Sequence, residues 1–429
     1  MVATGRFRQA FDIGLIFLFF YGLVFNGFPI PASKLVWGYL FLVLSKRSLL
    51  QHALKNQMLK YCFWVWVIFS LHYVLMMIFT DNYYTVFLRN ILWFFVEGVF
   101  GAFMLYMYLS KRYETKKMLS MAFVAIVIQS IFVVLTFISV PLRDFINTIL
   151  TITDERGFSS YRMKGFSNFG GAGLSYLQMI GVVYGGVLFL TERVNKRRKS
   201  LTMMGIFVIT VAQLFIGRTG LAASIFLMII IFLQQAKNKK SMLSLIGQVG
   251  IGLISIVSLY VVLVNVIPDN LKNTFNDRVI YRSMEVIENY EHSGDVSTSS
   301  TDHLQTMYFL PETEIGILLG TAQWDENRGN REYVGRMVES DVGYVRIIFA
   351  VGVIISTVFY SMYLKYIRDL LNTEIAGYLN ILLWCLLFIF IAGELKEPFL
   401  VRPTGIIKSL FFLYFVFLGR GNLDMGRRV

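Results

Sequence analysis

Residues 201–234 read LTMMGIFVITVAQLFIGRTGLAASIFLMIIIFLQ, one long and mostly apolar segment whose single charged residue is Arg218. A single helix of this length would be roughly 50 Å long at ~1.5 Å per residue, whereas the hydrocarbon core of a bilayer is ~30 Å thick. The segment therefore predicts two helices joined by a turn between Gly217 and Gly220. Each helix would be slightly too short to cross a bilayer, so we expect the turn to lie in a recess below the membrane surface.

The composition of the whole chain is that of a membrane protein. Of its 429 residues, 56% are hydrophobic and 16% are aromatic, and the mean hydropathy is +0.61. A soluble domain of this composition would have too little polar surface to cover its core. Only two cysteines are present, both in or beside apolar runs, so we expect neither a disulfide framework nor a zinc site.

Long apolar runs predict about twelve membrane-spanning helices. The first run follows Arg6 and Arg8 in the manner of a signal peptide, but it is long and PIPASK is a poor cleavage sequence, so we expect a retained helix. The predicted fold is an all-α integral membrane protein in which residues 1–429 form a single polytopic domain. The expected spans are 11–28, 34–45, 61–79, 85–109, 118–140, 168–190, 201–217, 219–234, 243–266, 341–364, 376–393 and 405–419.

The basic residues predict the orientation of the chain. Four short connections are rich in Lys and Arg: SKRSLLQHALKNQMLK (45–60), SKRYETKK (110–117), TERVNKRRKS (191–200) and QQAKNKKS (234–241). By the positive-inside rule, these connections and both termini belong in the cytoplasm. That side would hold 23 of the 40 Lys and Arg residues but only 6 of the 27 Asp and Glu residues. The net charge of +13 therefore reflects topology and contact with anionic lipid, and we expect no nucleic-acid partner.

Two long connections fall on the opposite, outer side, at residues 141–167 and 267–340. The second is the largest polar region of the chain, and we expect it to form a small helical cap over the site. The 17 basic residues of the outer side comprise 12 Arg and 5 Lys. Because Arg holds phosphate through a planar fork of donors, this excess favours a phosphate-binding face. Scatter in small numbers is the alternative explanation.

Arg218 is the first candidate for such a site. A charge within the membrane costs at least ~2.5 kcal/mol on insertion scales and normally faces a cavity and a partner. The flanking glycines would let the backbone turn tightly and leave room for a ligand. We interpret Arg218 as the floor of an anion site that opens outward. The alternative is a turn residue that snorkels and pairs with a carboxylate.

Three stretches resemble the O-antigen polymerase and O-antigen ligase superfamily. LFIGRTGLAASIF (214–226) resembles the Ser-Arg-Thr-Gly turn of these proteins, and YRMKGFSNFGGAGLS (161–175) resembles their Arg-x-x-Gly stretch. ESDVGYVRIIFAVGVI (339–354) is similar to the segment that closes their large periplasmic loop. The ligases usually carry a His there, followed by Gly eleven positions later. In this chain Asp341 stands at the His position and Gly352 lies eleven residues further on.

The resemblance implies a GT-C-like glycosyltransferase of the bacterial inner membrane that builds surface polysaccharide, such as lipopolysaccharide. Its substrates would be oligosaccharides linked by pyrophosphate to undecaprenol, and it would transfer them at the periplasmic face with inversion. The lipid tail would lie between membrane helices, and a chain-length regulator protein is an implied partner. No metal motif is present, so we expect Arg groups, without a metal or other cofactor, to stabilise the leaving pyrophosphate.

The acceptor hydroxyl needs a general base. We choose Asp341, because it begins a predicted span at the edge of the site and matches the family's His. Its alternative role is that of an N-cap or first-turn acid, which the helix dipole favours. Glu339 is the second candidate, and its alternative role is a solvated loop acid. His292 and His303 also lie in the large loop, where a solvated His is the common case.

Four further arginines are candidates for pyrophosphate binding. Arg162 lies within the Arg-x-x-Gly stretch, and Arg336 lies just before the closing segment. Arg278 and Arg282 are four residues apart, so on a helix they would share a face and could clamp a diphosphate. Their alternative role is pairing with Glu285 or other loop acids.

Three functions remain open. The main prediction is an inverting, metal-independent O-antigen polymerase, and Asp341 in place of His favours it over the ligase that transfers finished glycan to the lipid A core. A polysaccharide transporter or flippase would also have about twelve helices. We see no internal repeat of the kind expected in a transporter, and the unusual polar residues are concentrated on one face.

Overall fold

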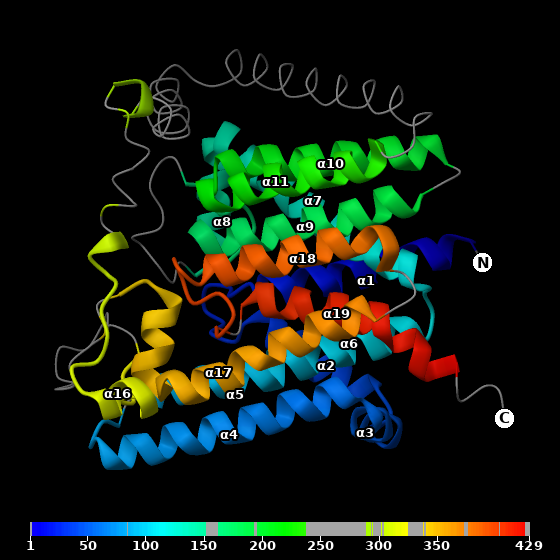
Figure 1. The fold of residues 1–429 in the computed structure, drawn as a ribbon. Coiled ribbons are helices and arrows are strands. Elements are labelled where there is room, and N and C mark those ends of the chain that lie inside the picture. Colours follow the sequence, from blue (N-terminus) through cyan, green and yellow to red (C-terminus); the bar gives the residue numbers. More distant parts are fainter. Residues whose placement is uncertain are drawn as a thin grey trace.

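A computed structural model describes residues 2–83, 85–151, 162–192, 195–236, 289–292, 294, 302, 304–324, 338, 340–372, 376–402 and 404–424. These residues are almost entirely helical and contain no strand beyond isolated bridges from Phe25 to Phe28 and Leu150 (Figure 1). The elements are α1 (Val2–Tyr21), α2 (Ala32–Val43), α3 (Lys46–Lys55), α4 (Gln57–Phe79), α5 (Thr85–Trp93), the π-helix η1 (Phe94–Phe100), α6 (Gly101–Ser110), α7 (Thr115–Ile138), α8 (Val140–Ile149), α9 (Gly171–Thr191), α10 (Lys196–Leu214), α11 (Arg218–Ala236), α16 (Glu314–Leu319), α17 (Gly343–Leu371), α18 (Ala376–Gly393) and α19 (Gly405–Asp424).

Six helical segments in the described part are long and apolar enough to cross a membrane. They are Gln57–Phe79, Thr85–Ser110, Thr115–Ile138, Gly171–Thr191, Arg218–Gln235 and Gly343–Leu371. Shorter apolar helices cover Ala32–Val43, Leu379–Gly393 and Gly405–Leu418. The prediction of an all-helical fold is therefore confirmed, and several long apolar helices support a multi-pass membrane protein. The predicted span 243–266 lies outside the described residues.

Helix α9 is the centre of the bundle. Its apolar window is 89% buried, and α7, α10, α11, α18 and α19 all pack against it. Gly181 faces Ile126 of α7, and Gly186 faces Ile231 of α11, so closely that a Cβ would lie 2.5 Å from either side chain. Small residues of this kind let membrane helices approach closely, where van der Waals contact replaces a hydrophobic driving force.

The two ends of the bundle differ. We call one the terminal end, because α1 begins there and α19 ends there, as Figure 1 shows. We call the other the site end, because it holds the turn between α10 and α11, the start of α17 and the connection between α18 and α19. The α10–α11 and α18–α19 connections therefore both lie at the site end.

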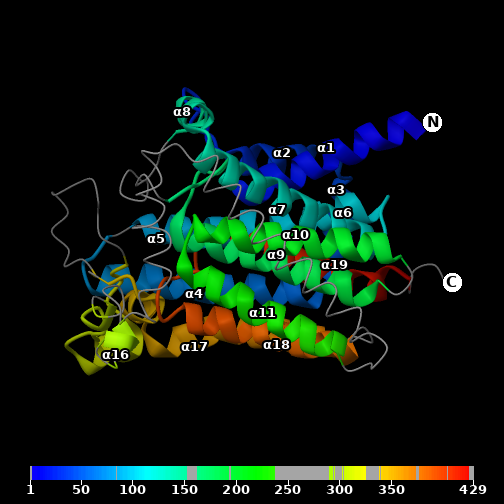
Figure 2. The same ribbon diagram turned by 90° about the horizontal axis from the view of Figure 1, so that it is seen from above.

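Two predicted loops contain helices. The basic connection 45–60 includes α3, on which Leu49 is buried and Leu50 and Leu54 are exposed. The outer connection 141–167 begins with α8, which Ser139 caps by accepting a hydrogen bond from the Leu142 N–H over 3.3 Å. Figure 2 shows α8 beyond the end of α7, away from the start of α1. Most of the second outer connection, 267–340, lies outside the described residues.

Helix α17 is interrupted at Gly352, which has φ 71° and ψ 172°. The end of α16 lies against this break, and a Cβ on Gly352 would be 2.2 Å from the Leu318 carbonyl oxygen. Thr321 donates hydrogen bonds from its backbone N–H (2.7 Å) and its hydroxyl (3.0 Å) to the Phe349 carbonyl. Thr321, which follows α16, therefore satisfies the Phe349 carbonyl beside the break.

A buried ion pair joins η1 to α19. Lys408 of α19 donates a hydrogen bond to Glu97 of η1, and both side chains are almost fully buried. The π-helical turn is a distortion that often marks a special position within a helix. Glu97 of η1 thus pairs with a residue of another helix.

Candidate functional site

The turn that carries Arg218 is formed as its sequence predicts. Helix α10 ends at Leu214, Gly217 donates a backbone hydrogen bond to Gln213 over 3.0 Å, and α11 begins at Arg218. Arg218 is half-buried. The N-terminal turn of α11 therefore brings the positive end of a helix dipole and a guanidinium to the same place, an arrangement that favours anions.

Gly220 has a different role from the one expected. It packs against α9, where a Cβ would lie 2.1 Å from Ser175 Oγ and 2.6 Å from the Ser175 carbonyl oxygen. Ser175 in turn donates a hydrogen bond from Oγ to the Gly217 carbonyl over 2.8 Å. Gly220 therefore lets α11 approach α9, and the space beside it is filled by Ser175 instead of a ligand.

The stretch that contains Arg162 is held against this turn. The Met163 N–H donates to the Phe215 carbonyl over 2.7 Å. Gln129 of α7 donates to the Lys164 carbonyl over 2.7 Å and accepts from the Phe166 N–H over 3.1 Å. Arg162 is exposed beside the turn, whereas Lys164 is buried, and burial lowers the pKa of Lys164 to about 8.

The connection between α18 and α19, residues 394–404, brings a third cation to the turn. Lys396 Nζ donates a hydrogen bond to Thr219 Oγ1 over 2.9 Å, in the first turn of α11. Partial burial lowers the pKa of Lys396. The charge on Glu397 opposes this shift, and the nearby charges of Arg218 and Arg162 reinforce it. Lys396 therefore shares one electrostatic environment with both predicted arginines.

Asp341 lies at the same place. Its charge also acts on Lys396, where it raises the pKa of the ammonium group. Arg346 of α17 is buried and donates from Nη2 to Asp341 Oδ1 over 3.0 Å and from Nε to the Ser340 carbonyl. The Asp341 side chain is 50% exposed. The N-cap of α17 is Val342, so Asp341 is not the capping residue.

Two glutamates of the 394–404 connection, Glu394 and Glu397, lie close to these charged groups. Burial raises the pKa of Glu397, Arg402 and Lys396 lower it, and Asp341 raises it further. Burial also raises the pKa of Glu394, to about 8, although Leu400 N–H (2.6 Å) and Tyr360 OH (2.8 Å) both donate to its carboxylate. The Glu394 carbonyl accepts from the Gly343 N–H over 2.8 Å. Glu394 therefore ties the end of α18 to the start of α17.

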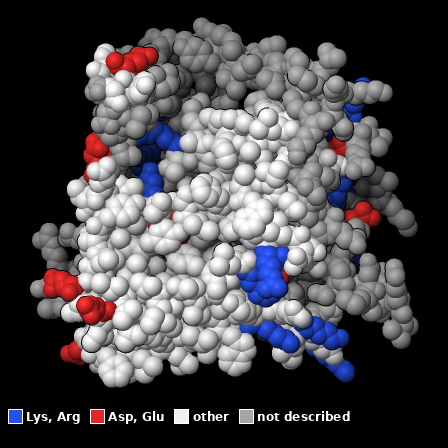
Figure 3. Space-filling view, in the orientation of Figure 1, with Lys and Arg blue, Asp and Glu red and all other residues white. Residues whose placement is uncertain are grey.

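We call this group the charged cluster. It combines five basic side chains with two acidic ones, so it carries a net positive formal charge. Figure 3 shows Lys and Arg side chains gathered in a hollow at the site end. Such a cluster can hold a doubly charged anion in the hollow while a carboxylate beside it accepts a proton. Its members are Arg162, Arg218, Asp341, Arg346, Lys396, Glu397 and Arg402.

The cluster contains some of the predicted residues and adds others. The charges of Arg218, Arg162 and Asp341 all act on Lys396, while Glu339, Arg336, Arg278 and Arg282 lie outside the described residues. Four members were not predicted: Arg346, Lys396, Glu397 and Arg402. The last three lie in GELKEPFLVRP (393–403), which follows an apolar span directly and carries four charges. Among the described residues, no group of three or more His, Cys, Asp and Glu side chains could hold a metal ion.

Comparisons of this chain with protein-family models, with curated proteins and with solved structures give no match.

Proposed function

We propose that this protein is an O-antigen polymerase, a glycosyltransferase that joins undecaprenyl-pyrophosphate-linked oligosaccharide repeats in the bacterial inner membrane. Under this proposal the chain crosses the membrane about twelve times, with both termini in the cytoplasm. The site end faces the periplasm, and residues 267–340 cap the charged cluster. The observation that carries the proposal is the meeting of Arg162, Arg218 and Lys396 from three separate segments beside Asp341.

The three cations suit a pyrophosphate leaving group. Arg162 and Arg218 offer planar forks of N–H donors, and Lys396 offers a compact ammonium group. Because Lys396 is positioned by Thr219 at the start of α11, it adds to the positive helix end there. Negative charge grows on the pyrophosphate as its bond to the sugar breaks, and fixed cations in a partly buried hollow stabilise that charge.

The reaction would be a direct displacement. The acceptor hydroxyl oxygen attacks the anomeric carbon of the donor sugar, the carbon–oxygen bond to the pyrophosphate breaks, and the pyrophosphate leaves with the electron pair. The hydroxyl proton passes to a carboxylate, and the configuration at the anomeric carbon inverts. Asp341 is half-exposed and its charge acts on Lys396, so it is our first candidate for the base.

Glu397 is a second candidate that the structure adds. The nearby charge of Asp341 adds to the effect of burial in raising the pKa of Glu397. Arg346 donates a hydrogen bond to Asp341 over 3.0 Å, and burial raises the pKa of Glu397. A base works best when its pKa lies near the operating pH, which favours a group shifted upward.

The test is the surface glycan of a strain that lacks this protein. Loss of a polymerase leaves glycans of one repeat attached to the lipid A core, visible as a single step on a gel. Loss of a ligase leaves no lipid A-linked chains, and loss of a flippase leaves lipid-linked repeats on the cytoplasmic face. Restoration of the ladder by the wild-type chain and not by Arg218→Lys would support the proposal. A full ladder in the deletion strain would contradict it.

A further inference from the structure

A cavity of about 550 Å³ opens near the terminal end, between α7, α9 and α10, far along the helices from the charged cluster. One part of its wall is charged and the other is apolar. The charged part comes from the first turns of α7 and α10 and the end of α9. The lining residues are Glu114, Lys116, Lys117, Ser120, Phe123, Val124, Val127, Leu188, Glu192, Arg198, Leu201, Thr202 and Gly205.

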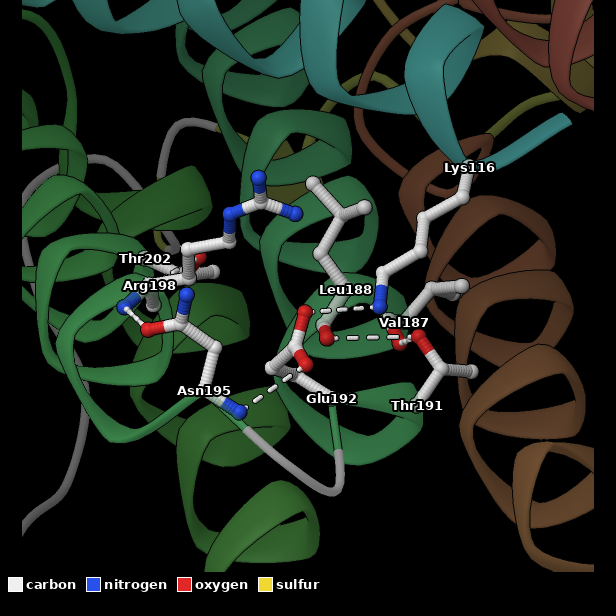
Figure 4. Close-up of polar contacts among 8 residues, drawn as sticks. All are labelled: Lys116, Val187, Leu188, Thr191, Glu192, Asn195, Arg198 and Thr202. Carbon is white, nitrogen blue, oxygen red and sulfur yellow. Dashed lines mark hydrogen bonds and ion pairs between the residues drawn. The ribbon is translucent and has the colours of Figure 1, made fainter. Parts of the chain in front are cut away.

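Several polar residues at the rim of the cavity are hydrogen-bonded to one another. Glu192 accepts from Lys116 Nζ over 2.7 Å and from the Asn195 N–H over 3.2 Å, so its carboxylate is already engaged. Asn195 caps α10 by accepting from the Arg198 N–H over 3.0 Å. Figure 4 shows these contacts, with the Arg198 guanidinium extending to the side of Leu188 and away from Glu192.

Lys117 and Arg198 are therefore the cations of the rim that form no ion pair with a described residue. Glu114 is the other acid at the rim, and it is exposed. The surrounding segments are strongly basic, because 111–117 holds four Lys and Arg residues and 196–199 holds four more. The mouth of the cavity thus favours an anion.

The apolar wall runs from this rim into the bundle. Phe123, Val124 and Val127 of α7 face Leu201 and Gly205 of α10. Gly205 makes the wall possible, because a Cβ there would lie 2.6 Å from the Phe123 ring. From Lys116 to Val127 the cavity follows α7 for eleven residues, roughly 16 Å at ~1.5 Å per residue. That depth is about half of a ~30 Å hydrocarbon core, or one leaflet.

We propose that this cavity binds an anionic phospholipid of the cytoplasmic leaflet. The phosphate would lie between Lys117 and Arg198, and one acyl chain would fill the apolar wall down to Val127. A cationic rim above an apolar groove one leaflet deep matches both parts of such a lipid, and basic pockets between membrane helices on this side are known to bind acidic headgroups. The choice of leaflet rests on the proposed orientation of the chain, whereas the lipid site itself does not depend on glycosyltransferase activity.

The experiment measures lipid binding to the full-length purified protein by native mass spectrometry. The probes are phosphatidylglycerol, phosphatidylcholine and free glycerol phosphate. We expect Lys117→Gln/Arg198→Gln to weaken phosphatidylglycerol binding about 30-fold, or about 2 kcal/mol at 1.4 kcal/mol per factor of ten. The loss should be much smaller for phosphatidylcholine, because its choline group balances the charge of the phosphate. Val124→Trp, which fills the wall from an exposed position, should weaken binding of both lipids.

Arg47→Gln/Lys55→Gln is the matched control, because it removes two exposed cations of α3 near the same end. An equal loss of phosphatidylglycerol in this control would show general attraction to the basic surface and would overturn the site. Equal binding of both lipids to the wild type would also overturn it. Glycerol phosphate that binds as tightly as phosphatidylglycerol would reduce the cavity to an anion site without a lipid. Melting temperatures of each variant without lipid confirm that it is folded.

Discussion

Lys396 and Thr219 are joined by a hydrogen bond of 2.9 Å that links the connection after α18 to the first turn of α11. The two residues are 177 positions apart, and their contact brings a primary ammonium group next to Arg218. Glu397 and Asp341 offset part of the repulsion among these cations, and the net positive charge that remains attracts phosphate groups.

Arg218→Lys should weaken binding of the lipid-linked donor and abolish most transfer, although the charge is retained. The reason is that an ammonium group cannot reproduce the two parallel hydrogen bonds of a guanidinium to a phosphate. Donor binding to the purified variant is the measurement. Arg143→Lys in α8, a change at the same end of the bundle outside the charged cluster, is the control. Normal donor binding by Arg218→Lys would show that Arg218 has only a structural role in the turn.

Glu394 should make the folded protein less stable as the pH rises from about 5 to about 8. Its pKa in the folded protein is about 8, whereas an exposed Glu has a pKa of ~4.3. Between these values the folded state holds a proton that the unfolded state has lost, so the free energy of unfolding falls with increasing pH. Melting temperatures in detergent at pH 5 to 9 would show this decline in the wild type and a flatter profile in Glu394→Gln. Glu314→Gln, at an exposed position of α16, should keep the wild-type profile.

The turn between α10 and α11 could be predicted because it follows from length alone. An apolar segment of 34 residues exceeds the thickness of a bilayer, and Gly217 and Gly220 mark the place where it reverses. Arg162 could also be predicted as a site residue, because 161–175 resembles a family motif. Both predictions rest on features that are local in the sequence.

Lys396 and the break at Gly352 could not be predicted in the same way. The position of Lys396 depends on how α18 packs beside α11, which no local periodicity encodes. The spacing of Gly352 from Asp341 is visible in the sequence, but its positive φ is set by the end of α16, whose Leu318 carbonyl lies against it. Contacts between segments that are distant in the sequence therefore could not be predicted from the sequence alone.

Lys408→Met should strongly destabilise the protein, because it leaves the Glu97 carboxylate buried without its partner. Loss of one member of a buried ion pair commonly costs about 3–5 kcal/mol. The double change Lys408→Met/Glu97→Gln should recover much of this loss, since no charge then remains buried. Thermal unfolding in detergent compares the three proteins. A single variant as stable as the wild type would show that the pair in η1 and α19 contributes little.

The proposed orientation predicts that a thiol at the site end is accessible only from the periplasm. Glu314→Cys, in exposed α16, should react with an impermeant maleimide added to intact spheroplasts, and Ser200→Cys, in α10, should not. Both substitutions are made in a chain in which Cys62 and Cys385 are replaced by Ser, so that no other thiol responds. Reaction at Ser200→Cys with none at Glu314→Cys would place the charged cluster in the cytoplasm.

Glycan growth in a purified system tests the central claim most directly. The wild-type protein, supplied only with an undecaprenyl-pyrophosphate-linked oligosaccharide, should produce chains of increasing repeat number. Asp341→Asn should bind the donor normally and extend it ~10²–10⁴-fold more slowly, as expected for loss of a general base. If Glu397→Gln alone shows that loss, Glu397 is the base and the polymerase proposal stands. A wild-type protein that binds the donor and forms no longer chain would contradict the account.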